Sequence, residues 1–366
     1  MQLALYRSFR PKTFDGVIGQ DHIVKALKNQ VESGKIGHAY LFCGTRGVGK
    51  TSCAKIFAKA INCLHPKNGS ACGECEVCKA LNDPSNVDIL EIDAASNNGV
   101  DEIRTLREKI KYPPIHGKYK VYIIDEVHML TDSAFNALLK TLEEPPAHAV
   151  FILATTESYK LPQTILSRCM RFDFRLVSKE ELVKLTKKIF DEIGVSCDDQ
   201  AIDLIAKAGE GSVRDTLSIA DCVVAFAGNN ITLEKVVEIL GTSDRDSVVK
   251  VVDDMIAKNL GGVLKDIDDF CKAGRNLVAF GKELTSHFKD LLVVKTCVDA
   301  EKMLEITKED YAKYQSQAKI LSADTLIAFM QKFGEIESEL KFALSPRTLI
   351  ELKCLECASY GDEKKN

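Results

Sequence analysis

Residues 44–51 of this chain read Gly-Thr-Arg-Gly-Val-Gly-Lys-Thr, a complete G-x-x-x-x-G-K-[ST] phosphate-binding loop. Its glycines allow a tight backbone turn that points several N–H groups at phosphate oxygens. Lys50 is placed to reach the β- and γ-phosphates of a nucleotide, and the Thr51 hydroxyl to ligate Mg²⁺. An apolar run at 40–43 precedes the loop and a helix-like stretch at 52–60 follows it, so a helix N-terminus adds positive charge. This context favours an ATP and Mg²⁺ site over a chance glycine-rich turn.

A second group of candidate catalytic residues stands at the end of an apolar segment. Residues 121–124 read Val-Tyr-Ile-Ile and are followed by Asp125 and Glu126. In enzymes with such a loop, an aspartate at a strand end helps to hold Mg²⁺ beside the loop hydroxyl. The next carboxylate is placed to polarise the attacking water as a general base. An acidic pair at a strand end is otherwise often a solvated turn, but the upstream loop favours a hydrolytic site.

Four cysteines lie close together after the phosphate-loop helix, with C-x8-C-x2-C-x2-C spacing: Cys63, Cys72, Cys75 and Cys78. C-x2-C spacing lets two thiolates reach one ion from a tight turn, and four thiolates complete a tetrahedral zinc site. Because four protein ligands leave no open coordination position, we expect a structural zinc ion here and not four unrelated core cysteines. The other C-x2-C pair, Cys354 and Cys357, has no second pair nearby, which favours helical packing.

The composition limits the class of protein. The net charge is −4 and the pI is near 6.1, so any nucleic-acid contact must come from a local basic patch. The N-terminus lacks a signal-peptide hydrophobic region, and no run approaches the roughly 18 apolar residues of a membrane span. With thirteen cysteines in the chain, these features predict a reducing cytoplasmic location and no membrane association.

The elements that must position these residues can be read from the apolar pattern. Short strands alternate with helices from residue 37 to residue 175, and their near-continuous Val, Ile and Leu content predicts a parallel sheet covered on both faces. The expected strands are 39–43, 88–92, 120–125 and 149–155, and a helix is expected at 131–144. Beyond 178 the strand signals disappear, and periodicity predicts helices at 179–193, 199–209, 212–226 and throughout 231–360. The polar tail 361–366 is expected to be disordered.

Several further motifs occur in the order found in a known family. They include Arg10-Pro11, Asp125-Glu126-Val127-His128, Thr155-Thr156, Ser167-Arg168-Cys169 and the segments 138–146 and 211–215. Together with the phosphate loop they resemble the AAA+ clamp-loader ATPases, and more closely the bacterial DNA polymerase III gamma/tau family, whose zinc module matches all four cysteines. The resemblance covers at least the first 240 residues. It implies an α/β P-loop (RecA-like AAA+) parallel-sheet domain at 1–178 with a zinc insertion at 63–78, an all-α lid at 179–240 and an all-α oligomerisation collar at 241–366.

The resemblance also implies roles for single residues. Thr156 is expected to be the sensor-1 residue near the γ-phosphate, Arg214 the sensor-2 cation of the lid, and Arg168 an arginine finger for a neighbouring subunit's ATP. A guanidinium suits a finger because phosphoryl transfer spreads negative charge over the γ-oxygens. An isolated arginine would more often form a surface ion pair, so these roles depend on the motif context. The expected ATP-binding residues are Arg10, Pro11, Val17 and Ile18 around the adenine, and Gly44, Thr45, Arg46, Gly47, Val48, Gly49, Lys50, Thr51 and Ser52 in the loop.

For DNA, the family implies a grip on primer–template duplex mostly through its phosphates. Arg104 and Lys140 match basic phosphate-contacting positions of the family. Some relatives carry further basic residues where this chain has Asn97-Asn98-Gly99, which lowers the expected salt dependence of its DNA contact. Backbone N–H groups at the start of a helix can still bind phosphate. Ordinary surface cations remain an equally open interpretation.

The family's activity would make this chain an ATP-driven motor subunit of the DNA polymerase III clamp loader. ATP binding would open and hold a sliding clamp, and DNA-triggered hydrolysis would release the clamp on DNA. Expected partners are other clamp-loader subunits, the sliding clamp, primer–template DNA and the polymerase core, in hetero- or homo-oligomers. We identify no polymerase carboxylate constellation in the chain, so polymerase activity would belong to the holoenzyme.

Two alternatives are a non-hydrolysing AAA+ stator subunit and a branch-migration helicase. The intact Lys50, Thr51, Asp125 and Glu126 disfavour the stator, and the zinc insertion with the Ser-Arg-Cys motif disfavours the helicase.

The segment 241–366 carries more apolar positions than one narrow helical stripe requires. They include Leu284, Phe288, Leu291, Leu292, Val293 and Val294 in one stretch, and Leu326, Ile327, Met330, Phe333 and Ile336 in another. A self-contained bundle and contact with another subunit would both bury them, and the resemblance favours oligomerisation. For Lys50 we expect a solvent-facing side chain, so that its removal abolishes turnover without unfolding the protein.

Overall fold

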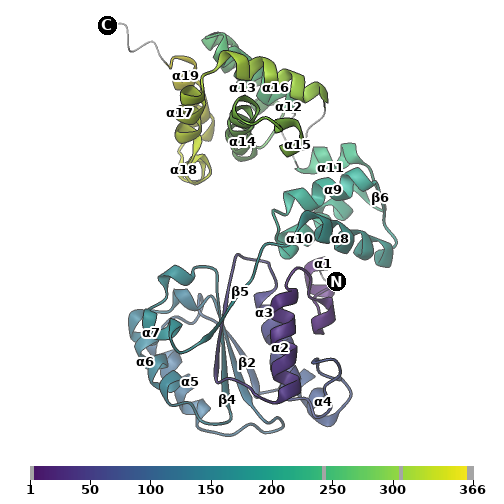
Figure 1. The fold of residues 1–366 in the computed structure, drawn as a ribbon, viewed down its shortest axis with the longest axis vertical. Coiled ribbons are helices and arrows are strands. Elements are labelled where there is room, and N and C mark those ends of the chain that lie inside the picture. The colour runs from purple at the N-terminus through teal and green to yellow at the C-terminus, as the bar shows by residue number, and fades with distance from the viewer. Residues whose placement is uncertain (1–3, 241–244, 305–307, 361–366) are drawn as a thin grey trace. The chain divides into compact units, whose positions relative to one another are not determined.

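The computed structural model describes residues 4–240, 245–304 and 308–360. The chain divides into two compact units, Met1–Val236 and Val237–Asn366, and each is described here by itself (Figure 1). The expected tail at 361–366 lies outside the described residues, as do residues 241–244 at the expected boundary between lid and collar. The expected domain limits at 178 and 240 remain predictions.

The first unit is built on a five-stranded parallel sheet with strand order β2-β3-β4-β1-β5. The strands are β1 (Ala39–Cys43), β2 (Ile89–Asp93), β3 (Lys120–Asp125), β4 (Ala149–Thr155) and β5 (Met170–Asp173). The prediction of a parallel sheet is confirmed, with β2 one residue later than expected. The edge strand β5, which pairs with β1, was not predicted.

Helices cover both faces of this sheet, as Figure 1 shows. Tyr40 and Phe42 of β1 pack with α2 (Asp21–Ser33) and α3 (Lys50–Ala60) on one face. Leu41 and Cys43 point to the other face, which α5 (Val100–Ile110) and α6 (Asp132–Glu143) cover. This alternation follows from the period of two along a strand. The remaining short helices are α1 (Leu5–Ser8), α4 (Glu76–Asn82), α7 (Gln163–Leu166), and the 3₁₀ turns η1 (Phe14–Gly16), η2 (Val127–Met129) and η3 (Ser158–Lys160).

The segment after the sheet forms a small helical layer. It contains α8 (Lys179–Ile193), α9 (Asp199–Ala208), α10 (Val213–Ala227) and the start of α11 (Leu233–Leu240), in agreement with the expected helices. Ser178 and Glu181 form a capping box that begins α8, and Gly194 ends the helix in a left-handed conformation. The expectation that strands vanish beyond residue 178 was wrong in one detail. Two-residue strands β6 (Ser196–Cys197) and β7 (Asn230–Ile231) pair in parallel, and such a short pairing carries no sequence periodicity.

All regular secondary structure among the described residues of the second unit is helical. Its helices are α12 (Arg245–Ile256), α13 (Leu260–Lys272), α14 (Leu277–Thr296), α15 (Ala300–Met303), α16 (Lys308–Ile320), α17 (Ala323–Phe333), α18 (Ile336–Phe342) and α19 (Pro346–Ala358). Helix α14 packs against α16, α17 and α18 and buries Phe280, Leu284, Phe288 and Leu291. Cys354 and Cys357 lie buried in the same core, as expected for helical packing.

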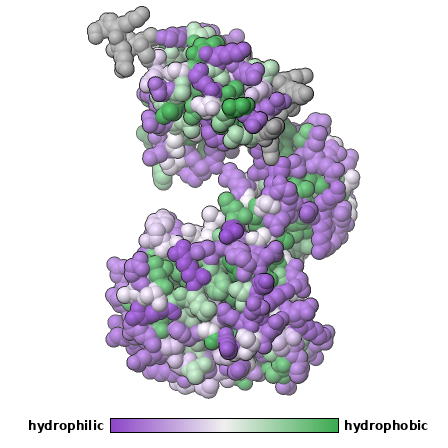
Figure 2. Space-filling view, in the orientation of Figure 1, coloured by the Kyte–Doolittle hydropathy of each residue, from purple (hydrophilic) through white to green (hydrophobic). Residues whose placement is uncertain are grey.

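Much of the apolar excess in this second unit is accounted for by its own core. Leu326, Phe333 and Ile336 are buried, and Leu292, Val294 and Met330 pack partly against them, whereas Ile327 is exposed. Hydrophilic residues dominate the visible face of the units, with hydrophobic residues scattered among them (Figure 2). Across the described residues, none of the helices combines the length and apolar character that crossing a membrane requires.

Candidate functional site

The phosphate loop lies between β1 and α3, at the edge where the carboxyl ends of the parallel strands meet. Gly44, Gly47 and Gly49 all have positive φ angles, of 145°, 79° and 102°. A Cβ at position 44 would lie 2.6 Å from the carbonyl oxygen of Phe174, and one at position 47 would collide with Ser212 Oγ. The glycines are thus required by the turn and by the close approach of neighbouring segments.

Lys50 is buried, and only 5% of its surface is exposed, so the expectation of a solvent-facing side chain was wrong. Its Nζ donates to the carbonyl oxygens of Gly44 at 2.7 Å and Thr45 at 2.8 Å, both within the loop. Burial lowers the pKa of Lys50, and the nearby Glu126 and Asp125 oppose this shift. The loop therefore wraps around its own lysine and holds the ammonium group through two of its carbonyl oxygens.

The two residues expected to hold Mg²⁺ are in direct contact. Thr51 Oγ1 donates to Asp125 Oδ2 at 2.7 Å, and Asp125 Oδ1 accepts from the backbone N–H of Glu126 at 3.1 Å. A hydroxyl and a carboxylate are oxygen ligands of the kind that Mg²⁺ takes together with substrate phosphates. The donor set brought together from α3 and β3 thus fits the expected ion.

Glu126, the expected general base, is fixed by the end of the neighbouring strand. Its backbone is left-handed, with a φ of 49°, and its Oε2 accepts from the N–H and the hydroxyl of Thr156 at 3.2 and 3.0 Å. The structure thereby brings together Lys50, Thr51, Asp125, Glu126 and Thr156. Their assigned catalytic roles remain predictions.

His128 is a residue of this cluster to which sequence reasoning gave no role. Its Nε2 lies 3.1 Å from Glu157 Oε2, and its Nδ1 lies 3.1 Å from Thr155 Oγ1 and 3.4 Å from Glu126 Oε2. The ring therefore links the ends of β3 and β4. Its place in the Asp-Glu-Val-His motif was the available signal.

A cleft of about 970 Å³ opens over the loop. Eleven of the thirteen expected ATP-binding residues line it: Arg10, Pro11, Val17, Ile18, Arg46, Gly47, Val48, Gly49, Lys50, Thr51 and Ser52. Gly44 and Thr45 do not line the cleft but hold Lys50 through their carbonyl groups. The lining also includes Tyr6, Lys55, Glu91, Asp93, Leu185 and Leu217, which sequence reasoning missed because they come from five separate segments.

Arg214 reaches this cleft from the helical layer. It lies at the start of α10, where Ser212 caps the helix by accepting from the N–H of Asp215. The backbone N–H of Arg214 donates to Gly47 O at 3.4 Å, and its side chain lines the cleft. The guanidinium lies over the Tyr6 ring, 5.2 Å from its centroid. The structure thus places the expected sensor-2 cation at the same cleft as the loop, and its role stays a prediction.

Arg168 does not line the cleft. Its Nη2 donates to Glu143 Oε1 at 2.7 Å, and its Nη1 donates to Thr164 O at 2.8 Å. Within this single chain, Arg168 therefore forms the surface ion pair that is the alternative to a finger role. A role toward a neighbouring subunit stays a prediction.

The four clustered cysteines converge on one point, and their sulfur atoms all lie within 4.8 Å of one another. Cys72 Sγ and Cys78 Sγ are 3.9 Å apart. Zinc–sulfur bonds of about 2.3 Å in a tetrahedron imply sulfur separations of about 3.8 Å, so the cluster fits zinc closely. Backbone N–H groups of Cys72, Cys75 and Cys78 donate to the preceding sulfurs, and such bonds lower the pKa of Cys72 to about 6. Burial instead raises the pKa of Cys63 and Cys78, and a bound cation would favour the thiolate at all four.

The expected DNA-contacting residues are exposed on two helices that pack against each other. Arg104 on α5 pairs with Asp101 at 3.1 Å, and Lys140 lies on α6. Thr131, which caps α6, donates from its backbone N–H to Asn98 O at 3.2 Å. The structure places both cations on one pair of helices, and their contact with DNA stays a prediction.

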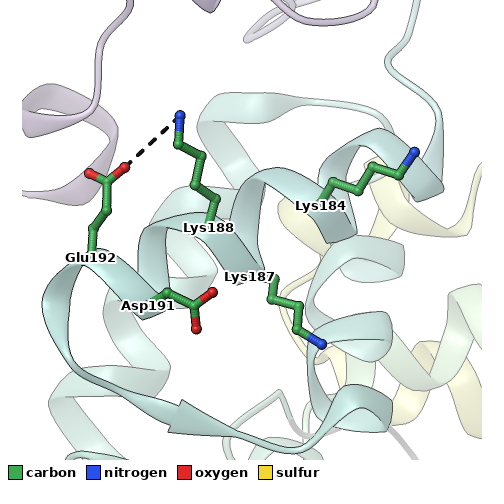
Figure 3. A pocket seen from close by; sticks show the side chains of 5 residues that line it. All are labelled: Lys184, Lys187, Lys188, Asp191 and Glu192. Atoms are coloured by element: carbon green, nitrogen blue, oxygen red, sulfur yellow. Dashed lines mark ion pairs between the residues drawn. The ribbon is translucent and has the colours of Figure 1, made fainter.

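A further hollow lies on the exposed side of α8 and is lined by Lys184, Lys187, Lys188, Asp191 and Glu192 (Figure 3). Lys188 and Glu192 pair at 4.0 Å, and Lys187 pairs with Asp199 at 2.7 Å. These are ordinary ion pairs of a solvated helix face, and we assign no site there.

Comparison with known proteins gives a consistent family across nearly the whole chain. Residues 19–178 match the family model "DNA polymerase III, delta subunit", and residues 181–229 match "DNA polymerase III clamp loader subunit, ATPase lid domain". Residues 231–363 match "DNA polymerase III subunits gamma and tau domain III".

Among curated relatives, the chain is 42% identical to DNA polymerase III subunit tau of Bacillus subtilis, over 95% of this chain and 62% of that protein. It is 44% identical to DNA polymerase III subunit tau of Escherichia coli, over 74% of this chain and 42% of that protein. The chain thus spans less than two thirds of the length of these relatives.

Among solved structures, the RuvB Holliday junction branch migration motor of Thermotoga maritima is similar with a TM-score of 0.50 and 21% identity. The match covers 68% of this chain and 79% of that one, and at this identity it shows the shared fold alone. The fold, the cleft and the sequence matches agree, and the chain belongs to the DNA polymerase III gamma/tau subunit family.

Proposed function

We propose that this chain is the ATP-driven motor subunit of a bacterial clamp loader, which places a sliding clamp on primed DNA during replication. The observation that carries the proposal is the convergence of Lys50, Thr51, Asp125 and Glu126 at one cleft, with Arg214 reaching it from the lid. The names of the tau relatives support the association with DNA polymerase III.

In this proposal the cleft binds ATP between the N-terminal segment, the loop and α10. Lys50 leaves its two carbonyl partners to bind the phosphates, and Thr51 and Asp125 would hold Mg²⁺. The ion would neutralise charge that develops on the phosphates. Glu126 polarises the attacking water, and Thr156 keeps its carboxylate in place through two hydrogen bonds.

Hydrolysis is proposed to be completed by a neighbouring subunit. Arg168 would leave Glu143 and stabilise the γ-phosphate charge at the next site, as an arginine finger does in trans. The bridge between Glu143 and Arg168 connects α6, which also carries Lys140, with the segment that holds the finger. Contact of Lys140 with DNA phosphates would therefore act on the same helix that restrains Arg168, and α5, which carries Arg104, packs against that helix.

The proposed partners are other clamp-loader subunits, the sliding clamp, primer–template DNA and the polymerase core. The second unit is proposed to form the oligomerisation collar. The cysteine cluster is proposed to hold a structural zinc ion, which stabilises the segment 63–78. A reducing cytoplasmic location is proposed with it, because clustered cysteines bind metal there more often than they cross-link.

The experiment that tests the function is single-turnover ATP hydrolysis by the chain assembled with clamp-loader subunits, with and without clamp and primed DNA. A motor subunit hydrolyses ATP, and clamp with DNA together raise the rate. A stator subunit gives no hydrolysis at its own site under any condition. A branch-migration motor responds to branched DNA without the clamp, and either of these two results would replace the proposal.

A further inference from the structure

Arg214 has an aromatic partner where an arginine more commonly has an acidic one. Its guanidinium lies 5.2 Å from the centroid of the Tyr6 ring, and the ion pairs formed by the described residues do not include it. Arg168 offers the contrast within the same chain, because Glu143 pairs with it at 2.7 Å. The two arginines of the proposed hydrolytic machinery are therefore held in electrostatically different ways.

Tyr6 is presented by a short N-terminal helix that is tied to the same helix as Arg214. The backbone N–H of Leu5 donates to Asp221 Oδ2 at 3.0 Å, and the Leu5 side chain is buried where α1 packs on α10. Arg7 Nε donates to the Tyr6 hydroxyl at 3.1 Å. Both Tyr6 and Arg214 line the nucleotide cleft. The ring is thus held at the cleft by contacts on either side of it in the sequence.

An aromatic partner has a physical consequence that a carboxylate does not have. A carboxylate would neutralise the guanidinium, and an incoming phosphate would have to compete with it. A ring attracts the cation through its quadrupole and leaves the net charge in place. The cation is thereby ordered before the nucleotide arrives, which reduces the entropy lost on binding. The charge then remains available for the additional negative charge of a triphosphate.

We propose that Tyr6 is a positioning residue, which holds Arg214 at the cleft with its charge unneutralised so that the chain favours nucleoside triphosphate over diphosphate. The inference rests on the proposed function, because it takes Arg214 as the lid cation that reads the γ-phosphate. It adds that α1, through Tyr6, takes part in distinguishing the triphosphate from the diphosphate. Tyr6 acts through Arg214 and needs no contact with the nucleotide.

The test compares the affinity of the full chain for a non-hydrolysable ATP analogue and for ADP, both with Mg²⁺, by titration calorimetry. Tyr6→Leu removes the ring, Tyr6→Phe keeps it, and Arg214→Ala removes the cation. Tyr112→Leu is the matched control, because this exposed tyrosine lies outside the cleft. Circular dichroism melting checks each fold, and Tyr6→Met is the second variant if Tyr6→Leu does not fold.

We expect Tyr6→Leu to weaken binding of the analogue by roughly two- to fivefold, the strength of an exposed cation–π contact, with unchanged ADP affinity. Tyr6→Phe should retain the wild-type preference, and Arg214→Ala should lose roughly tenfold or more. Unchanged or tighter analogue binding by Tyr6→Leu, beside a weakened Arg214→Ala, would overturn the role of Tyr6 alone. An equal loss for ADP would make Tyr6 merely structural and would also overturn it. Wild-type analogue binding by Arg214→Ala would instead remove the lid cation from the proposed function.

Discussion

Replacement of Lys50 by Met is expected to abolish tight ATP binding while leaving the free energy of unfolding almost unchanged, and the contacts of Lys50 allow both effects to be sized. Lys50 Nζ donates to two loop carbonyls and its side chain is buried beneath the loop. Met has a similar length and an apolar end, so Lys50→Met removes the charge and both hydrogen bonds with little change in volume. In the nucleotide complex the same ammonium group would donate to phosphate oxygens.

The expected effect on ATP affinity is much larger than the expected effect on the free energy of unfolding. Two charge-assisted hydrogen bonds to phosphates, at about 1.5–3 kcal/mol each, amount to about 3–6 kcal/mol, or roughly 10²- to 10⁴-fold in ATP affinity. In the free protein, the loss of the two hydrogen bonds is offset because the variant no longer has to bury an ammonium group. That burial is unfavourable for the charged form and lowers the pKa of Lys50. We therefore expect the free energy of unfolding to change by no more than about 1 kcal/mol, which corresponds to a melting shift of about 2–4 °C.

The assay measures ATP affinity by titration calorimetry and melting by circular dichroism on the same preparations. Lys59→Met is the matched control, since Lys59 lies on the same helix, outside the cleft, and donates to Asn82. The control should bind ATP as the wild type does. A folded Lys50→Met variant with wild-type affinity would refute the assignment of the loop. A loss of binding accompanied by a collapse in melting temperature would refute the separation of the two roles.

The remaining predictions concern assembly and metal. Arg168→Ala should leave ATP affinity of its own site unchanged and lower hydrolysis in the assembled complex by roughly 10³–10⁵-fold, and equal rates in steady-state assays would remove the finger role. Elemental analysis should find zinc in the wild type and none after Cys75 and Cys78 are both replaced by Ser; unchanged melting of that metal-free variant would argue against a structural site. Deletion of 241–366 should give a monomeric ATP binder with depressed turnover, as light scattering and hydrolysis assays would show. A truncated chain that still assembles with loader subunits would place the oligomerisation surface elsewhere.

The part of the molecule that could be predicted from sequence is the part encoded locally. The strands β1, β3 and β4 are buried on both faces, so their apolar runs are unbroken and their limits agree with prediction. The phosphate loop and the C-x2-C turns specify their own geometry through glycine and spacing. The edge strand β5 reads Met-Arg-Phe-Asp and is largely exposed, so it carries no such run and was missed.

The contacts that cross the fold could not be predicted in the same way. The ring of Tyr6 over Arg214 joins two segments that are far apart in the sequence, and nothing local to either indicates the pair. The burial of Lys50 follows from the path of the loop backbone, which the motif does not describe. The contact of His128 with Glu157 needs the alignment of β3 beside β4, which only the sheet order provides.

The measurement that tests the central claim most directly is clamp loading itself. Labelled sliding clamp is incubated with primed circular DNA, the other loader subunits and ATP, with this chain as wild type or as Lys50→Met, and clamp retained on DNA is counted after gel filtration. The account predicts retained clamp with the wild type and ATP, and little with Lys50→Met or without ATP, because ATP binding at the cleft is what opens and holds the clamp. Equal retention without this chain, or with the wild type in the absence of ATP, would contradict its role as the motor subunit.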